Sequence, residues 1–358
     1  MTDRIYVIAE AGVNHNGSLE MALQLVDAAA EAGADAVKFQ TFDAKKLASA
    51  DAPKAAYQKE TTDRAESQVA MLRKLELPRE WHAELQARAR QRGIEFLSTA
   101  FDADSLAFLD ALGVPLFKVP SGELTNGPLL WRFARTGKPL VVSTGMATLA
   151  EVEQALAVIA HALNADAEPT GSDAVWEGWS LAAWRASLQG RVTLLHCTSQ
   201  YPTPPAEVNL RGMDTLAAAF GLPVGYSDHT EGGLIPTAAV ARGAILIEKH
   251  FTLDRSLPGP DHRASLEPAE LNRMVADIRA LALALGDGRK APQASEWDTR
   301  RAARQQVVAA RDIEAGTLLT RADLGTARAG RGRPAMDLWD LVGQRAGRGY
   351  RAGETLDR

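Results

Sequence analysis

The sequence predicts a (β/α)8 barrel followed by a small second domain. Short runs rich in β-branched residues alternate with longer, Ala-rich amphipathic stretches, a pattern typical of βα units and a parallel sheet. There are eight such runs, and eight strands are the number that closes a barrel. An open doubly wound sheet shows the same alternation, so the prediction of a barrel depends on this count and on the polar residues that follow the strands.

Small-residue turns stand ahead of most of the expected strands. Ala32-Gly33-Ala34 and Arg242-Gly243 are examples, and such turns are common where a helix ends and the chain returns to a sheet. Between the strands, residues 19–31 and 149–163 are expected to form amphipathic helices. The expected strands cover residues 5–9, 36–40, 95–99, 116–119, 140–143, 192–197, 224–227 and 245–249.

The regular alternation is interrupted twice. Residues 165–190 contain Trp176, Trp179 and Trp184 among Gly, Ser and acidic residues, and we expect an insertion that packs as a surface helix. After a long helix over residues 267–285, the composition changes to that of a linker. We therefore predict a barrel of residues 1–287, a linker of residues 288–297 and a second domain of residues 298–358.

Composition and charge argue against several classes of protein. The net charge of -5 and the pI near 5.9 do not suit a nucleic-acid-binding surface. No apolar run approaches the roughly 18 residues of a membrane helix, and the amino terminus lacks the apolar region of a signal peptide. A single cysteine, Cys197, agrees with a reducing compartment. We expect a cytoplasmic protein.

Polar residues gather at the carboxyl end of every expected strand, where barrel enzymes build their active sites. A Ser or Thr at any one of these positions is as readily explained as a helix cap, but capping does not explain eight strands together. The polar residues are Glu10, Lys38, Gln40, Ser98, Thr99, Lys118, Ser121, Glu123, Ser143, Thr144, Thr198, Ser199, Tyr201, Ser227, Asp228, His229, Glu248, Lys249 and His250.

Two lysines lie within apolar strands, Lys38 in AVKFQ and Lys118 in LFKVP, where a buried ammonium group needs an anionic partner. Hydroxyl groups nearby suit phosphate and carboxylate oxygens, which indicates a phosphorylated carboxylic acid as the ligand. A strand lysine can instead form a Schiff base with a carbonyl substrate, and the residues leave both uses open. The hydroxyl groups belong to Thr99, Ser121, Ser143 and Ser227.

His229 and His250 follow consecutive strands, so their imidazoles can converge on one cation. A single buried histidine is more often a core residue, but the shared position at the strand ends favours a metal site. With only two protein nitrogens, the metal would keep positions open for substrate oxygens. His196, inside the sixth strand, is expected to be structural.

A series of motifs extends over nearly the whole chain: AEAGVNHNG, AVKFQTF, FLSTAFD, FKVPSGELTN, STGMA, YPTP, GYSDHT, EKHFTL and GPDHRASLEP. In these motifs the sequence closely resembles the sialic acid synthase family, which condenses phosphoenolpyruvate with an amino sugar. The resemblance implies a barrel followed by an antifreeze-like (SAF) domain. It also implies a divalent cation, Mn2+ before Mg2+ or Co2+, and a domain-swapped homodimer in which each small domain covers the partner's barrel.

The resemblance also implies roles for individual residues. His229 and His250 would hold the metal, and the candidates for proton transfer are Glu10, Glu123 and Asp261. Phosphoenolpyruvate would be held by Lys38, Thr99, Lys118, Ser121, Ser143 and Ser227. The sugar would face Glu10, Gln40, Glu123, Tyr201 and Asp261.

The sequence departs from the family pattern at two points. Ser199 stands where N-acetylneuraminate-forming members commonly have Asn, and the legionaminate-type synthases resemble the present form. The expected acceptor is therefore N-acetylmannosamine or a 2,4-diacetamido-6-deoxy relative. In the small domain, Arg328 precedes Ala329 where the family has proline, and the resemblance implies that this arginine reaches the sugar in the partner's barrel.

Two other classes of protein use the same features. A Schiff-base aldolase would employ a strand lysine on the same barrel. A non-catalytic protein that binds a sugar or a phosphate would keep the fold without turnover.

Overall fold

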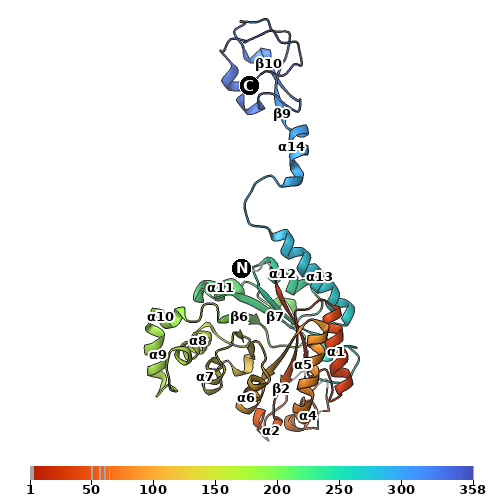
Figure 1. Cartoon of the computed structure of the whole chain (residues 1–358), viewed down its shortest axis with the longest axis vertical. Helices are drawn as coiled ribbons and strands as arrows, with labels where there is room; N and C mark the ends of the chain where they lie inside the picture. Colours follow the sequence, from red (N-terminus) through yellow and green to blue (C-terminus); the bar gives the residue numbers. More distant parts are fainter. Residues whose placement is uncertain (1–3, 50, 56–57, 60–61, 64, 358) are drawn as a thin grey trace. The chain divides into compact units, whose positions relative to one another are not determined.

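The computed structural model describes residues 4–49, 51–55, 58–59, 62–63 and 65–357, and the chain divides into two compact units, Met1–Gly286 and Asp287–Arg358 (Figure 1). Each unit has its own hydrophobic core.

The first unit is built on eight strands whose hydrogen-bonded neighbours are all parallel. Their order is β3-β2-β1-β8-β7-β6-β5-β4, and β3 and β4, at the two ends of this order, also contact each other. The sheet therefore curves into a nearly closed barrel, which confirms the predicted fold. The strands are β1 Tyr6–Gly12, β2 Ala36–Thr41, β3 Glu95–Ala100, β4 Phe117–Val119, β5 Leu140–Ser143, β6 Val192–Cys197, β7 Val224–Asp228 and β8 Leu246–His250.

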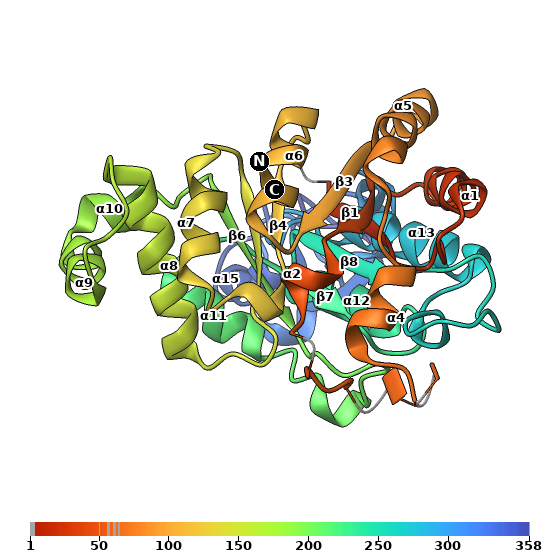
Figure 2. The ribbon, with the colours of Figure 1, turned by 90° about the horizontal axis from the view of Figure 1, so that it is seen from below.

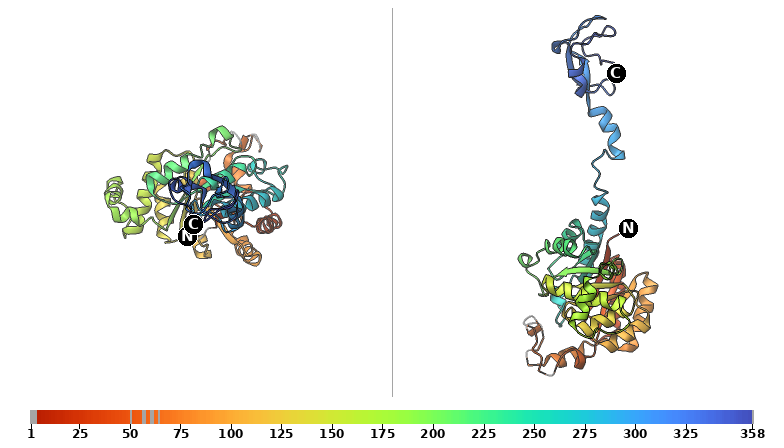
Figure 3. Two further views of the ribbon diagram at one scale, coloured as in Figure 1. Left: turned by 90° about the horizontal axis from the view of Figure 1, so that it is seen from above. Right: turned by 90° about the vertical axis from the view of Figure 1, so that its left-hand side faces the viewer.

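Helices surround these strands (Figure 2). They are α1 Leu19–Glu31, α2 Ala44–Leu47, α4 Gln68–Lys74, α5 His82–Arg92, α6 Ala103–Leu112, α7 Gly127–Arg135, α8 Leu149–Asn164, α9 Ser172–Ser180, α10 Ala182–Ala186, α11 Gly212–Phe220, α12 Leu234–Ala241 and α13 Pro268–Leu285. The segment with α2 and α4 follows β2 and lies at the carboxyl end of the strands (Figure 3).

Local signals explain where several helices begin and end. The Ser18 side chain accepts a hydrogen bond from the backbone of Met21 at the start of α1, and Thr148 with Glu151 forms a capping box at the start of α8. At the end of α6, Gly113 adopts the left-handed conformation, with a φ of 83°.

The insertion between β5 and β6 forms two short helices, α9 and α10, instead of the one surface helix that we expected. Both pack against α8. Trp179 donates a hydrogen bond of 2.9 Å to Glu153, and Trp184 meets the ring of His161 edge to face. These contacts give Trp179 and Trp184 a packing role.

The interior of the barrel is organised in layers because alternate residues of each strand point inward. A deep apolar layer closes the barrel, and it consists of Ile8, Ala36, Leu97, Val141, Leu195 and Leu246, with Tyr6 and Leu116 packed against it. In β7 this layer is occupied by Gly225, where an added Cβ would lie 2.4 Å from the carbonyl oxygen of Leu246. Two residues further along each strand, the next inward layer is polar.

The second unit contains the antiparallel pair of β9 Gln305–Ala309 and β10 Leu324–Arg328, with the short helices α14 Trp297–Ala303 and α15 Leu338–Leu341. Its core is separate from that of the barrel and includes Val307, Ile313, Leu324, Leu341 and Leu356. Among the described residues, no helix is long and apolar enough to cross a membrane.

Candidate active site

A cavity of about 430 Å3 opens at the carboxyl ends of the barrel strands. It is lined by most of the residues that the sequence singled out: Glu10, Lys38, Gln40, Thr99, Lys118, Ser121, Ser143, Ser199, Tyr201, Ser227, His229, His250 and Asp261.

The floor of this cavity is the polar layer directly above the deep apolar layer, which we call the apolar plug. Each of the eight strands contributes one residue, in the order Glu10, Lys38, Thr99, Lys118, Ser143, Cys197, Ser227 and Glu248. The hydroxyl of Ser143 is buried and has no hydrogen-bond partner among the described residues. It is therefore available to a ligand on the floor.

Two lysines and two carboxylates of this floor form a buried ionic network. The ammonium group of Lys38 lies 2.5 Å from Glu10 and 3.4 Å from Glu248, and it donates to Thr99 at 2.9 Å. The ammonium group of Lys118 lies 3.3 Å from Glu248. Each charge thus has a partner of opposite sign, as a buried charge requires.

The network shifts the pKa values of its two carboxylates in opposite directions. Burial raises the pKa of Glu10 to about 7, although Lys38 opposes this shift. Burial also acts to raise the pKa of Glu248, but the charges of Lys118 and Lys38 and the hydrogen bond from Ser227 hold it below its usual range. For Lys38, burial disfavours the charged form, and the two carboxylates outweigh burial and raise the pKa. Lys38 is therefore an ammonium ion at neutral pH.

The two histidines face each other above this floor. The ring centroids of His229 and His250 are 5.3 Å apart, and the ring of Tyr201 packs on that of His229 at 4.1 Å. Burial lowers the pKa of His229 to about 4, and burial with the neighbouring His229 holds the pKa of His250 well below its usual range. Both imidazoles are neutral at pH 7, which is the form that binds a metal.

The hydrogen bonds of the two rings also suit a metal. The carbonyl oxygen of Thr198 accepts a 2.8 Å hydrogen bond from Nδ1 of His229, which leaves the Nε2 lone pair available. Nδ1 of His250 is buried without a hydrogen-bond partner among the described residues. Those residues include no cluster of three or more His, Cys, Asp or Glu arranged as metal ligands. Two neutral imidazoles with available nitrogens are suitable ligands for a divalent cation.

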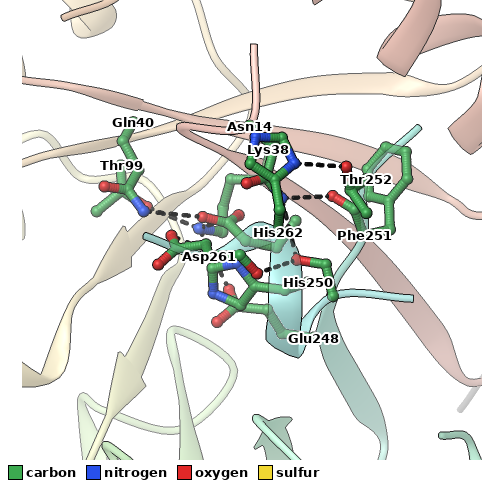
Figure 4. Close-up of polar contacts among 12 residues, drawn as sticks. Asn14, Lys38, Gln40, Thr99, Glu248, His250, Phe251, Thr252, Asp261 and His262 are labelled. Atoms are coloured by element: carbon green, nitrogen blue, oxygen red, sulfur yellow. Dashed lines mark hydrogen bonds and ion pairs between the residues drawn. The ribbon is translucent and has the colours of Figure 1, made fainter. Parts of the chain in front are cut away.

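Asp261 enters the site on the loop between β8 and α13, and this loop is bound to the loop after β1. The amide of Asn14 donates to the Phe251 carbonyl at 2.8 Å (Figure 4). It also donates to the Ser265 hydroxyl at 3.0 Å. Ser265 in turn donates to the Asp261 carbonyl at 2.6 Å. Asp261 lies 3.9 Å from Nδ1 of His250, and burial raises its pKa to about 6.

Two predicted residues do not line the cavity. Glu123 lies on the turn after β4, where its carboxylate accepts a 2.7 Å hydrogen bond from Asn126. Arg328 is exposed at the end of β10, in the second unit.

Two residues of the floor were not assigned a role in the predicted site, although Glu248 was noted among the polar residues at the strand ends. Glu248 and Cys197 belong to the floor, and Ser121 lies 3.3 Å from the Cys197 sulfur. The alternation of strand residues carries the signal, because each residue stands two positions after the apolar plug residue of its strand. Helix α4 and the residue that follows it add an apolar wall that has no such signal, formed by Met71, Leu72 and Leu75.

A barrel with a polar cavity at the carboxyl ends of its strands is the arrangement typical of barrel enzymes. The chain belongs to the NeuB family, whose model matches residues 25–290. The SAF domain model matches residues 304–357, which confirms the predicted nature of the second domain.

The relatives agree with this assignment. The chain is 45% identical over 350 residues to the N,N'-diacetyllegionaminic acid synthase of Campylobacter jejuni, with 98% of each chain covered. Identity to the enzyme of the same name from Legionella pneumophila is 45% over 351 residues, with 98% of this chain and 93% of the relative covered. The crystal structure of N-acetylneuraminic acid synthetase from Leptospira borgpetersenii in complex with citrate matches with a TM-score of 0.68 at 33% identity, over 83% of this chain and 90% of that chain.

Proposed function

We propose that the protein condenses phosphoenolpyruvate with an N-acetylated hexosamine to give a nine-carbon sialic-type acid and phosphate. The observation that carries this proposal is the floor of the cavity, where Lys38, Lys118 and several hydroxyl groups converge at the carboxyl ends of the strands. Cationic and hydroxyl donors in this arrangement suit a small ligand that bears both a phosphate and a carboxylate.

The chemistry needs one carbon–carbon bond to form and one carbon–oxygen bond to break. The enol carbon of phosphoenolpyruvate attacks the aldehyde of the open-chain sugar, and the aldehyde oxygen takes a proton. Water then adds to the cationic carbon and loses a proton, which gives a tetrahedral intermediate with a new hydroxyl group. This hydroxyl gives up its proton as the carbon–oxygen bond to phosphate breaks, so that a ketone forms and phosphate leaves. Glu10 and Asp261, whose pKa values lie near 7 and 6, are suited to exchange these protons.

We further propose that His229 and His250 hold a divalent cation, with Mn2+ as the first candidate. When bound, the cation would supply Lewis-acid polarisation of the aldehyde oxygen. The support is the facing pair of neutral imidazoles, which have free nitrogens at the wall of the cavity.

The state of Lys38 disfavours the Schiff-base alternative. A Schiff base forms from a neutral amine. The Lys38 ammonium is paired with Glu10 and Glu248, which raise its pKa and oppose deprotonation.

For the acceptor we propose a 2,4-diacetamido-6-deoxy hexose ahead of N-acetylmannosamine. Ser199 lines the cavity, and two relatives at 45% identity are N,N'-diacetyllegionaminic acid synthases.

We also propose a domain-swapped homodimer in which Arg328 reaches the sugar in the partner's barrel.

Phosphate release tests the reaction and the acceptor together. The enzyme is incubated with phosphoenolpyruvate and each of a panel of N-acetylated hexosamines, with and without a chelator. We expect sugar-dependent phosphate release that the chelator abolishes and Mn2+ restores. Turnover that survives chelation but is lost on borohydride treatment would favour the aldolase, and no turnover with any sugar would contradict the proposal.

A further inference from the structure

We infer, on the basis of the proposed metal site, that Asp228 and Lys249 are positioning residues. Their buried ion pair, which we call the brace, lies behind the barrel wall. It fixes the positions of His229 and His250 so that both imidazoles can bind one cation.

The brace follows from the alternation of strand residues. Asp228 directly precedes His229, and Lys249 directly precedes His250. Successive side chains of a strand point to opposite faces, so histidines that face the cavity place their charged neighbours on the far side of the wall. Asp228 and Lys249 are accordingly absent from the cavity lining, and they are paired in the register of β7 and β8.

The side chains of the two residues meet with no exposure to solvent. Their charged groups are 2.6 Å apart, and each side chain is 0% exposed. The ammonium group of Lys249 also donates to the carbonyl oxygen of Thr230. A single lysine on β8 therefore holds the residues on both sides of His229.

The Asp228 carboxylate closes a turn around the same histidine. It accepts hydrogen bonds from the Thr230 backbone at 3.2 Å and from the Thr230 hydroxyl at 2.9 Å, and Tyr226 donates to it at 2.9 Å. His229 stands at the apex of this turn.

The opposite side of His229 is fixed as well. Its ring donates to the Thr198 carbonyl at 2.8 Å, and its own carbonyl accepts a 2.8 Å hydrogen bond from the backbone of Thr203. Nε2 is the remaining ring nitrogen, and it is the nitrogen that a cation shared with His250 would use.

Stability alone does not account for such a pair. Two charges lose their hydration on burial, and apolar residues of similar volume are often as stable or more stable at such positions. The ion pair differs from an apolar pair in its fixed geometry, and here that geometry is transmitted to the two histidines through single peptide units.

Metal binding to the apoprotein tests the brace without any turnover. Mn2+ alone is titrated into the parent and into the double variant Asp228→Asn/Lys249→Met, which removes both charges together. The matched control is Asp35→Asn, because Asp35 also bridges a strand backbone to a basic side chain, Arg279, but precedes β2 at the opposite end of the barrel.

We expect the double variant to fold and to bind Mn2+ at least tenfold more weakly. Its dissociation constant for phosphoenolpyruvate, measured without metal, should change less than twofold. Electron spin-echo modulation of bound Mn2+ should show two coordinated imidazole nitrogens in the parent and in Asp35→Asn, and fewer in the double variant.

Several outcomes would overturn the brace. Parental Mn2+ affinity in the folded double variant would mean that the pair is only structural, and equal losses for Mn2+ and phosphoenolpyruvate would indicate general disorder of the strand ends. If the double variant does not fold, Asp228→Asn alone removes the ion pair and keeps the size of the side chain, and unchanged Mn2+ affinity in that variant would overturn the inference. A parent that does not bind Mn2+ would refute the proposed metal site itself, which separates the two failures.

Discussion

Lys38 and Lys118 differ in depth and in the number of carboxylates that neutralise them. Lys38 is 2% exposed and contacts two carboxylates, whereas Lys118 is 11% exposed and lies 3.3 Å from one. An anion that enters the cavity therefore meets Lys118 as its more accessible cation. The charge of Lys38 is balanced by Glu10 and Glu248.

We expect Lys118→Met to raise the KM for phosphoenolpyruvate by roughly 10- to 100-fold, since hydrogen bonds to a charged group contribute ~1.5 to 3 kcal/mol. The KM for the sugar should change little. Steady-state kinetics with each substrate varied in turn measures both values. Lys138→Met, which removes a lysine paired with Asp110 outside the cavity, is the control. Equal increases for both substrates would contradict the assignment of Lys118 to the anion.

A second prediction concerns the stability of the SAF domain and its pH dependence. Hydrogen bonds from the Thr320 side chain and backbone, and then from Arg311, lower the pKa of Asp323 to about 2. An unfolded Asp titrates at ~3.9, so the ionised carboxylate stabilises the fold above this pH, and the contribution is lost as the pH falls from about 4 to about 2.

In the full chain, Asp323→Asn should therefore speed amide exchange in β9 and β10 at pH 7. The difference from the parent should narrow at pH 3, because the unfolded parent already binds the proton there. Hydrogen exchange with mass spectrometry measures both. A difference that does not depend on pH would show that Asp323 acts by packing and not by its charge.

The sequence indicates which residues form the floor of the cavity. It does not indicate which of these residues form ion pairs with one another. Two lysines inside apolar strands were conspicuous, and alternation alone also identifies Glu248. The sharing of Glu248 between Lys38 and Lys118 depends on how strands far apart in the chain are staggered in the closed barrel. No local pattern encodes that stagger.

At the scale of elements, the loop after β1 supports the loop that carries Asp261. The side chain of Asn14 donates hydrogen bonds to the Phe251 carbonyl and to the Ser265 hydroxyl, and Asn14→Ala removes both. We expect faster amide exchange over residues 251–266 and a several-fold lower kcat, because Asp261 loses its fixed position beside His250.

Asn164→Ala is a matched control, since Asn164 likewise makes two side-chain hydrogen bonds, but at the end of α8. Its kcat and the exchange of residues 251–266 should equal those of the parent. Unchanged exchange in Asn14→Ala would show that the β8–α13 loop keeps its position without this support.

Strand and helix positions could be read from the pattern because they depend on local periodicity and caps. The division of the insertion into α9 and α10 could not. Leu181 separates the two helices with an extended backbone, a φ of -79° and a ψ of 120°, yet the segment WSLAAW has no Gly or Pro to mark a break. Both helices pack against α8, and such tertiary contacts are not encoded in the local sequence.

At the scale of the whole molecule, the proposed dimer assigns the SAF domain a task that the barrel cannot perform alone. Arg328 is exposed, and its guanidinium can donate paired hydrogen bonds to a sugar. We expect Arg328→Ala and His250→Ala to be nearly inactive as separate proteins. When the two are mixed and allowed to exchange subunits, activity should partly return, because a mixed dimer contains one barrel with His250 and a partner with Arg328.

Subunit exchange is followed independently with a fluorescent label on each variant, and parent mixed with Arg328→Ala sets the scale for recovery. No recovery despite exchange would mean that the arginine acts within its own chain or not at all. The motif around Arg328 predicts this role from the sequence, and the mixed dimer tests it.

The position of bond cleavage in phosphoenolpyruvate tests the central claim most directly. Substrate labelled with 18O in the oxygen that joins carbon to phosphorus is incubated with the enzyme, the acceptor sugar and Mn2+, and the released phosphate is examined by mass spectrometry. Condensation through a tetrahedral intermediate predicts that the label leaves with phosphate. Label retained in the nine-carbon product, with unlabelled phosphate released, would contradict the proposed chemistry.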